Sequence, residues 1–335
     1  MLRFIDGFDH GVNTYSGKWD SGAEANSAGA GRFTNPSGPS AACTVGNEIT
    51  KQKTIDDQAH WIVGFAIFRR DRFWATWFDS AGSSQVNIEC ENDGSIAIFR
   101  GGTVGDGTLL QATATGLLPA SEWHYLEFDV VIDNAGSWLV RLDGVPILSG
   151  TGDTQATSVA SARKFGFRGI LGGDNLQRID DLYIADGQAG RVTAPIGDVR
   201  VETQMPTGDG DFSNWTPLTG PDHWQMVDES PPDGDTSYNS ESTVNDRDSY
   251  THGAFPTVSG TVWGVQVCPA VRKDDAGTRG AKPFIRQGGV TADGPETLLV
   301  TTYRFLPYLR ETDPSGSNWT IATANSAQPG QVVST

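Results

Sequence analysis

Two carboxylates that could act together, Glu89 and Glu91, lie in the segment VNIECENDGSIAIFR. Side chains at positions i and i+2 of a strand point to the same face, and retaining glycosidases use two carboxyl groups about 5–5.5 Å apart. The segment also alternates Val86, Ile88 and Cys90 with polar residues, so a solvated polar face explains both glutamates without chemistry. We favour the solvated face. No residue is nominated as catalytic, and we do not expect an enzyme.

Acidic residues at alternate positions raise the question of calcium. Two loops have the Asp, Asp, Ser spacing of a calcium loop: Asp209, Asp211 and Ser213, then Asp233, Asp235 and Ser237. Position twelve of each loop, where a glutamate is expected, is Gly220 or Val244. Turns in which an Asp side chain binds nearby backbone explain both loops, and we favour them over calcium. We expect no organic cofactor.

A carbohydrate site would use aromatic side chains with polar neighbours. Trp74 and Trp77 in the segment DRFWATWFD are candidate contacts, with Asp79 beside them. Residues three apart on a regular strand face opposite sides, so at least one of the two tryptophans is expected in the core. Glycan binding therefore stays a secondary hypothesis.

Asp180 and Asp181 in the stretch QRIDDLYIADG are adjacent carboxylates. Neighbouring residues of a strand face opposite sides, so this pair is not expected to act together. We interpret the stretch as the strand that closes the first domain. A single-carboxylate contribution to a calcium site is the alternative.

The composition restricts the function classes. The 335 residues include 41 acidic and 24 basic ones, for a formal charge of -17, which disfavours binding to nucleic acid. No apolar run approaches the roughly 20 residues of a membrane span, and the N-terminus MLRFIDGFDHG has no apolar signal region. We therefore expect synthesis and retention in the cytoplasm. The three cysteines and five histidines show no zinc spacing and no disulfide framework.

Period-two patterning dominates the chain and predicts an all-β fold. In WHYLEFDVVID, alternate apolar residues form one face, and Glu127 and Asp129 point the other way. The dipeptide Asp143-Gly144 predicts a type I′ hairpin turn. WIVGFAIFRR is apolar on both faces, as in a strand covered on each side. The length favours two domains, and we place a β-sandwich at residues 1–190 and a smaller β domain at residues 197–335.

Three strands are expected in the second domain. TVWGVQVCPAV and AKPFIRQGG lie on either side of a polar turn, RKDDAGTRG, so the second segment is expected to return beside the first. TLLVTTYRFLPYL is expected to supply another strand.

Three stretches of the first domain follow one another along the sequence: FIDGFDH, then SEWHYLEFDVVID with the WLVRLDG hairpin, then IDDLYIADG. With them, residues 1–187 resemble concanavalin A-like lectin and laminin-G jelly rolls. The resemblance implies a jelly-roll β-sandwich, a fold that serves lectins, glycosidases and spacers alike. Lectin-like glycosidases use an acidic strand, E-x-D-x-x-E. This chain has Glu91 at the middle position and places Asp93 in an expected turn, so it departs from that pattern.

The second domain contains PTGDG at 206–210, DGDTSY at 233–238, VRKDDAGTRGAKPFIRQGG, and ETDP at 311–314 followed by Trp319. With these stretches it resembles the C-terminal part of virion structural proteins of tailed bacteriophages. The resemblance implies a tail- or fibre-associated virion protein, assembled in the host cytoplasm, that docks to other virion proteins. Self-association is expected, with a trimer as our guess, because virions contain threefold positions. Host glycan binding is a further expectation. A capsid decoration protein and a lectin-like glycoside hydrolase are the alternatives.

Overall fold

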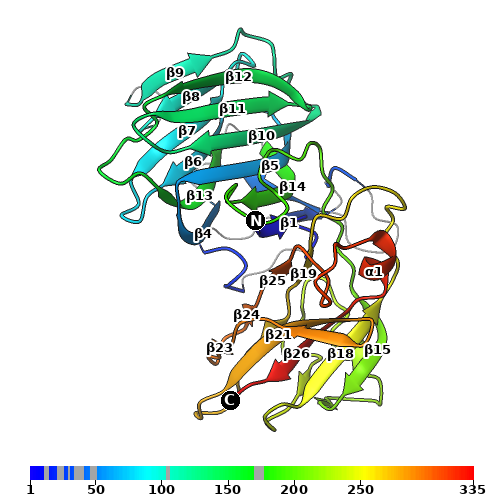
Figure 1. Cartoon of the computed structure of the whole chain (residues 1–335). Helices are drawn as coiled ribbons and strands as arrows, with labels where there is room; N and C mark the ends of the chain where they lie inside the picture. The colour runs from blue at the N-terminus through cyan, green and yellow to red at the C-terminus, as the bar shows by residue number, and fades with distance from the viewer. Residues whose placement is uncertain are drawn as a thin grey trace. The chain divides into compact units, whose positions relative to one another are not determined.

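The structure is a computed structural model of the chain (Figure 1). It describes residues 1–10, 15–20, 26–28, 31–33, 41–45, 51–102, 106–169 and 177–335. The chain divides into two compact units. Unit 1 comprises the described residues within Met1–Phe8, Trp19–Arg32 and Ala41–Val201. Unit 2 comprises those within Asp9–Lys18, Phe33–Ser40 and Glu202–Thr335, so a short segment near the N-terminus belongs to the second unit.

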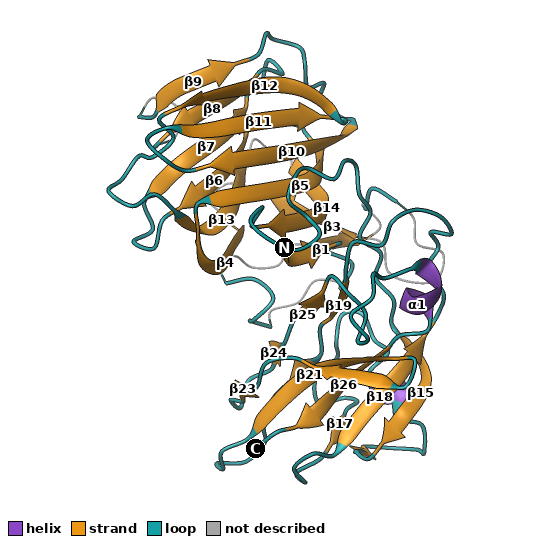
Figure 2. Ribbon diagram, in the orientation of Figure 1, coloured by secondary structure: helices purple, strands orange, loops and turns teal. Residues whose placement is uncertain are grey.

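The strands of unit 1 form two antiparallel sheets (Figure 2). The eight-stranded sheet contains β1 (Leu2–Asp6), β2 (Asn26–Ala28), β3 (Ala41–Val45), β5 (His60–Phe68), β10 (Trp123–Val131), β11 (Gly136–Leu142), β12 (Val145–Gly152) and β14 (Gln177–Ala185). Its order is β12-β11-β10-β5-β14-β3-β2, and β1 pairs with β14. The six-stranded sheet contains β4 (Lys51–Gln58), β6 (Phe73–Phe78), β7 (Ser84–Cys90), β8 (Ile96–Arg100), β9 (Thr108–Ala112) and β13 (Ala162–Gly169). Its order is β4-β13-β6-β7-β8-β9.

One hydrophobic core lies between the two sheets of unit 1. Phe65 and Phe128 enter it from the eight-stranded sheet, and Trp77 and Phe165 enter it from the six-stranded sheet. The rings of Trp77 and Phe128 meet edge to face with centroids 5.8 Å apart, which joins the two layers. Residues 61–67 of β5 are buried on both faces, as its apolar sequence predicts. The first unit is therefore the predicted all-β jelly-roll sandwich.

The hairpin of β11 and β12 confirms the predicted turn. Asp143 has φ 48° and Gly144 has φ 79°, and a type I′ turn needs positive φ at both central residues. The Asp143 carboxylate also accepts the backbone N–H of Tyr125 on β10 at 2.8 Å. The turn therefore fixes the register of β11 and β12 and ties both strands to β10.

Strand β14 is the last strand of unit 1 in the sequence and lies between β5 and β3. A β-bulge interrupts its pairing with β5 between Asp180 and Tyr183, and Asp181 has φ 52°. Ile179 and Leu182 both enter the core although they are three residues apart. The expectation that Asp180 and Asp181 face opposite sides is therefore wrong, because the bulge adds one residue and turns both carboxylates away from the core.

Unit 2 is built around a six-stranded antiparallel sheet. It contains β15 (Pro206–Ser213), β18 (Arg247–His252), β21 (Gly280–Gln287), β22 (Val290–Asp293), β23 (Thr297–Leu298) and β26 (Gln328–Val333). The order is β15-β18-β26-β21-β22, and β23 pairs with β21. Short pairs are β16 (Thr216–Pro217) with β17 (Asn239–Ser240), β19 (Val265–Val267) with β25 (Tyr308–Arg310), and β20 (Ala270–Val271) with β24 (Arg304–Phe305). The helices are η1 (Trp224–Met226) and α1 (Ile321–Asn325).

The return strand expected in unit 2 forms, but with other partners. β19 pairs with β25, whereas β21 pairs with β26 and β22. The long strand expected in TLLVTTYRFLPYL is divided into β23, β24 and β25. Small cores around Ile285 with Trp319, and around Ala281 with Leu306, hold these short pieces. No helix among the described residues is long and apolar enough to cross a membrane.

Candidate functional site

Polar side chains form a row along the outer side of β7, opposite the core. Val86, Ile88 and Cys90 enter the core, so Gln85, Asn87 and Glu89 lie on the outer face of the six-stranded sheet. All three have an exposed fraction of 0%. The expectation of a solvated polar face is therefore wrong for Asn87 and Glu89. Polar groups that are buried in this way are held by hydrogen bonds, and this row has them.

The row is organised by short hydrogen bonds across and along the strands. Thr76 Oγ1 on β6 donates to Asn87 Oδ1 at 2.6 Å, and Asn87 Nδ2 donates to Glu89 Oε1 at 3.0 Å. Glu91 lies beyond β7, where its carboxylate pairs with Arg72 Nε at 2.6 Å. The two glutamates thus have different environments and different partners.

Trp74 lies on the same outer face as Glu89. It is directly opposite Glu89 on one side and Arg168 of β13 on the other, and the Arg168 guanidinium lies 4.8 Å from the centre of a Trp74 ring. Trp74 is 4% exposed, and its buried Nε1–H makes no hydrogen bond with any described residue. Arg168 itself is exposed, so it forms the solvent side of this contact.

The other two predicted sugar contacts have structural positions. Trp77 lies in the core with 0% exposure, so its ring is not available to a sugar. The Asp79 carboxylate accepts the backbone N–H groups of Ala81 at 2.9 Å and Ser83 at 2.8 Å. It therefore shapes the turn between β6 and β7. Of the predicted trio, only Trp74 lies on the face opposite the core.

Together we call Trp74, Thr76, Asn87, Glu89 and Arg168 the candidate face. It combines an aromatic ring, an amide, a carboxylate and a guanidinium within three neighbouring strands. These groups provide the ring surface, donors and acceptors that sugar rings and hydroxyls need. Sequence analysis missed Thr76, Asn87 and Arg168. The only signal for Arg168 is the register that places it opposite Trp74, which requires strand pairing across more than 90 residues.

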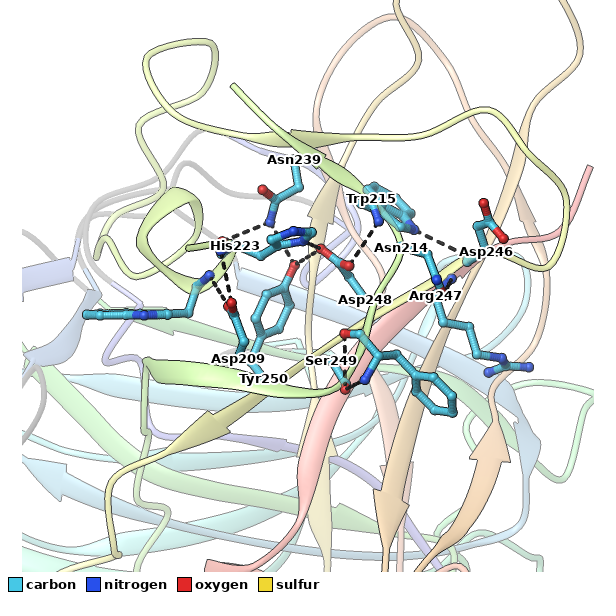
Figure 3. A network of polar contacts seen from close by, with 12 residues as sticks. Asp209, Asn214, Trp215, His223, Asn239, Asp246, Arg247, Asp248, Ser249 and Tyr250 are labelled. Carbon is cyan, nitrogen blue, oxygen red and sulfur yellow. Dashed lines mark hydrogen bonds and ion pairs between the residues drawn. The ribbon is translucent and has the colours of Figure 1, made fainter. Parts of the chain in front are cut away.

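A second polar network lies in unit 2 (Figure 3). His223 Nδ1 lies 2.8 Å from Asp248 Oδ2 on β18, and Asp248 Oδ1 accepts the backbone N–H of Trp215 at 3.1 Å. The Tyr250 hydroxyl donates to Asp248 at 3.3 Å and accepts from Asn239 Nδ2 at 3.0 Å. Burial raises the pKa of Asp248, which is 0% exposed, and the hydrogen bond from His223 opposes this shift.

The side chains around this network also hydrogen-bond to the backbone near η1. Asp209 accepts the N–H groups of His223 at 3.3 Å and Trp224 at 2.7 Å, and Asn239 donates to the His223 carbonyl. Among the described residues, His223 Nε2 contacts no hydroxyl that it could activate as a nucleophile. We assign the network to fixing the segment around η1 on the sheet.

The four weak calcium candidates each bind other groups of the chain. Asp209 caps the backbone as described, and Asp211 pairs with Arg286 Nε at 2.7 Å, which lowers its pKa. Asp233 accepts from Ser237 at 3.0 Å, and Asp235 accepts from Tyr303 and from Arg272, both at 2.9 Å. No group of three or more potential metal-ligating side chains occurs among the described residues.

Both adjacent carboxylates of β14 contact Arg32. Asp180 accepts the Arg32 backbone N–H at 2.7 Å, and Asp181 lies 3.6 Å from Arg32 Nη1. Asp181 also accepts the N–H of Val201 at 2.8 Å. It is 2% exposed, and burial raises its pKa to about 7. This buried cluster holds the segment that leads out of unit 1.

Comparisons with known proteins identify no family for this chain. No family model matches the chain, and no curated relative matches its sequence. Solved structures with similar folds include sheep galectin-11 in complex with glycerol, at 10% identity and a TM-score of 0.30, covering 40% of this chain and 96% of the galectin. They also include an endo-β-1,4-glucuronan lyase from Trichoderma reesei, at 14% identity and a TM-score of 0.36, covering 55% of this chain and 95% of the lyase.

An alginate lyase from a Chlorella virus is a further similar structure. Its identity is 8% and its TM-score is 0.36, and the match covers 52% of this chain and 93% of the lyase. At these identities the likeness concerns the lectin-like β-sandwich alone. The expectation that the chain is not an enzyme is contradicted by these matches, because polysaccharide lyases share the sandwich.

Proposed function

We propose that this chain binds carbohydrate through the candidate face, as a structural component of a tailed-phage virion. The observation that carries the carbohydrate proposal is the row of buried polar side chains beside Trp74, on the side of the sheet away from the core. A face that only had to be covered by protein would be stabilised more simply by apolar side chains. Polar groups on rigid strands suit a ligand that needs several directed hydrogen bonds.

Arg168 supports the same proposal. Its guanidinium lies over Trp74, yet its side chain is exposed and can move aside without disturbing the core. A sugar ring would then take its place over the indole, and the Trp74 Nε1–H would gain an acceptor. The carbohydrate proposal therefore predicts that the Trp74 ring is the energetic centre of the site.

The virion assignment rests on the resemblance carried by the residues of unit 2. Several of them support local structure: Asp209 binds backbone N–H groups, Asp235 pairs with Arg272, and Trp319 lies in a small core. Such a rigid unit suits docking to other virion proteins, in the tail or on a fibre. Sheet edges such as β15 offer unpaired backbone for self-association, with a trimer as the expected assembly. A position on the capsid surface is the alternative.

Carbohydrate binding is tested on the whole chain with a panel of neutral and acidic polysaccharides. We expect at least one of them to bind, and Trp74→Ala to weaken that binding by about tenfold or more. Leu109→Ala is the control, since it removes an exposed apolar side chain of the same sheet. Binding that survives Trp74→Ala in a folded protein would refute the candidate face. Release of unsaturated or reducing sugar ends is measured in the same samples, so that turnover is recorded with binding.

The virion assignment has a separate test. Purified particles of the phage that encodes the chain are digested and analysed by mass spectrometry, and labelled antibody locates the chain by electron microscopy. We expect stoichiometric copies at the tail or a fibre. Label on the capsid surface would support the decoration alternative, and particles without the chain would refute the assignment.

A further inference from the structure

An aromatic row lies on the outer face of the eight-stranded sheet, on the side of the sandwich opposite the candidate face. Phe65 and Ile67 of β5 enter the core, so the next residue, Phe68, lies on the other face of that strand. Phe68 is paired with Arg178 of β14 on one side and with Trp123 of β10 on the other. These three side chains therefore form one row across three neighbouring strands.

Arg70 joins this row from the end of β5. It follows Phe68 by two residues, and its backbone N–H donates to the side-chain oxygen of Gln177, the neighbour of Arg178, at 2.6 Å. The guanidinium groups of Arg70 and Arg178 each lie 5.3 Å from the centre of the Phe68 ring. The Trp123 ring lies beside Phe68, with ring centroids 5.6 Å apart. We call Phe68, Arg70, Trp123 and Arg178 the arginine patch.

The two guanidinium groups of the arginine patch are not used to stabilise the fold through polar contacts. Among the described residues, neither has a carboxylate partner or a side-chain hydrogen bond. Arg69 is different, because it is 4% exposed and donates to the backbone carbonyls of Leu118 at 2.8 Å and Glu91 at 3.2 Å. In a chain with 41 acidic residues against 24 basic ones, two adjacent arginines without such partners require an explanation.

The patch is accessible to a ligand. Arg70 is exposed, and Phe68, Trp123 and Arg178 are half-buried. A guanidinium that stacks on a ring keeps its N–H groups at the edge available, and a carboxylate, sulfate or phosphate group can accept them in pairs. The two rings hold the guanidinium groups near each other without neutralising them, as a carboxylate would.

We propose that the arginine patch is a second ligand site, on the other sheet from the candidate face, and that it binds an oxyanion group. The group is a carboxylate, a sulfate or a phosphate, held by Arg70 and Arg178 over Phe68, with Trp123 contacting the rest of the ligand. The net charge of -17 opposes anions at long range, but salt screens that repulsion beyond about 8–10 Å. This site does not depend on the carbohydrate function proposed above.

The test uses small probes that share one ring and differ in the charged group. Glucuronate, glucose 6-sulfate and glucose 6-phosphate are each titrated into the whole chain by calorimetry at low and moderate salt, with glucose as the neutral reference. We expect at least one charged probe to bind about tenfold or more tightly than glucose, with an affinity that falls as salt rises. The three probes identify which oxyanion is recognised.

Two double variants separate the patch from global charge. Arg70→Gln/Arg178→Gln is expected to lose the preference for the charged probe, and circular dichroism verifies its folding. Arg100→Gln/Arg163→Gln removes the same charge from two arginines of unit 1 that have carboxylate partners, and it is expected to retain the preference. Equal loss of the preference in both double variants would overturn the proposal.

A third variant tests the geometry and serves if the glutamine variant does not fold. Arg70→Lys/Arg178→Lys keeps both charges but lacks the planar group that stacks on Phe68 and donates in pairs. We expect it to bind the charged probe about threefold or more weakly than the wild type. Unchanged affinity would contradict the paired contact.

The result also separates this proposal from the carbohydrate function. If no charged probe binds more tightly than glucose, the oxyanion site is overturned. Carbohydrate binding at the candidate face would remain standing, because that face lies on the six-stranded sheet and is tested separately through Trp74.

Discussion

At the scale of single residues, burial changes the chemistry of carboxylates in this chain. Asp181 is the clearest example, because its carboxyl is enclosed beside Arg32 and under the backbone of Val201. Burial disfavours its charged form and raises its pKa to about 7, above the value of about 3.9 in an unfolded chain. The folded state therefore holds this proton more tightly than the unfolded state does.

The sign of the pH effect follows from linkage. Asp181 contributes stability that is fully present below about pH 4 and is lost as the pH rises towards about 7. Asp181→Asn stays neutral and can still accept the Val201 N–H. We expect the free energy of unfolding of the variant to be on the order of 1–3 kcal/mol greater than that of the wild type at pH 8. Near pH 4 the two values should be equal. Urea denaturation at both pH values measures this, with exposed Asp57→Asn as the control. If Asp181→Asn were less stable than the wild type at pH 8, the raised pKa of Asp181 would be refuted.

The two tryptophans of β6 differ in what their removal should cost. Trp77 packs against Phe165 and Phe128 in the core, with ring centroids 4.9 and 5.8 Å apart. We expect Trp77→Ala to lower the free energy of unfolding by about 3–5 kcal/mol, and Trp74→Ala to lower it by less. Chemical denaturation of both variants decides the point. A larger loss of stability in Trp74→Ala than in Trp77→Ala would contradict the position of Trp77 in the core.

At the scale of elements, turn chemistry determines several strand registers. Gly144 occupies the second positive-φ position of the β11–β12 turn, where a side chain would strain the backbone. We expect Gly144→Ala to lower the free energy of unfolding by about 1 kcal/mol. Ser149→Ala, at an exposed position of β12, is the control and should change it by less than about 0.5 kcal/mol. An unchanged stability in Gly144→Ala would argue against the type I′ turn.

These elements also show how far the sequence alone could be interpreted. Alternation correctly assigned the two faces of β10, and Asp143-Gly144 correctly predicted its turn, because both signals are local. The bulge at Asp180 and Asp181 leaves no local signal, since it depends on pairing with β5. Burial of Glu89 and the meeting of Trp74 with Arg168 likewise depend on neighbouring strands that are distant in sequence. Local patterns could therefore predict strands and turns, but not which polar faces are covered.

At the scale of the whole molecule, two units with separate cores should respond separately to damage. A Cβ at Gly330 would lie 2.2 Å from the Asp248 carbonyl oxygen in unit 2, and a Cβ at Gly64 would lie 2.2 Å from the Tyr183 ring in unit 1. We expect calorimetry of the wild type to resolve two transitions. Gly330→Ala should lower the free energy of unfolding of unit 2, and Gly64→Ala should lower that of unit 1, each by about 1–3 kcal/mol. If both variants lowered the same transition, the units would not unfold independently.

The central claim is that the face around Trp74 binds carbohydrate, and one calorimetric titration tests it most directly. The tightest polysaccharide of the panel is titrated into the wild type and into Trp74→Ala under identical conditions, with folding of both verified by circular dichroism. The account predicts measurable heat and a defined affinity for the wild type, and a loss of about tenfold or more for the variant. Identical titration curves for the two proteins would contradict it.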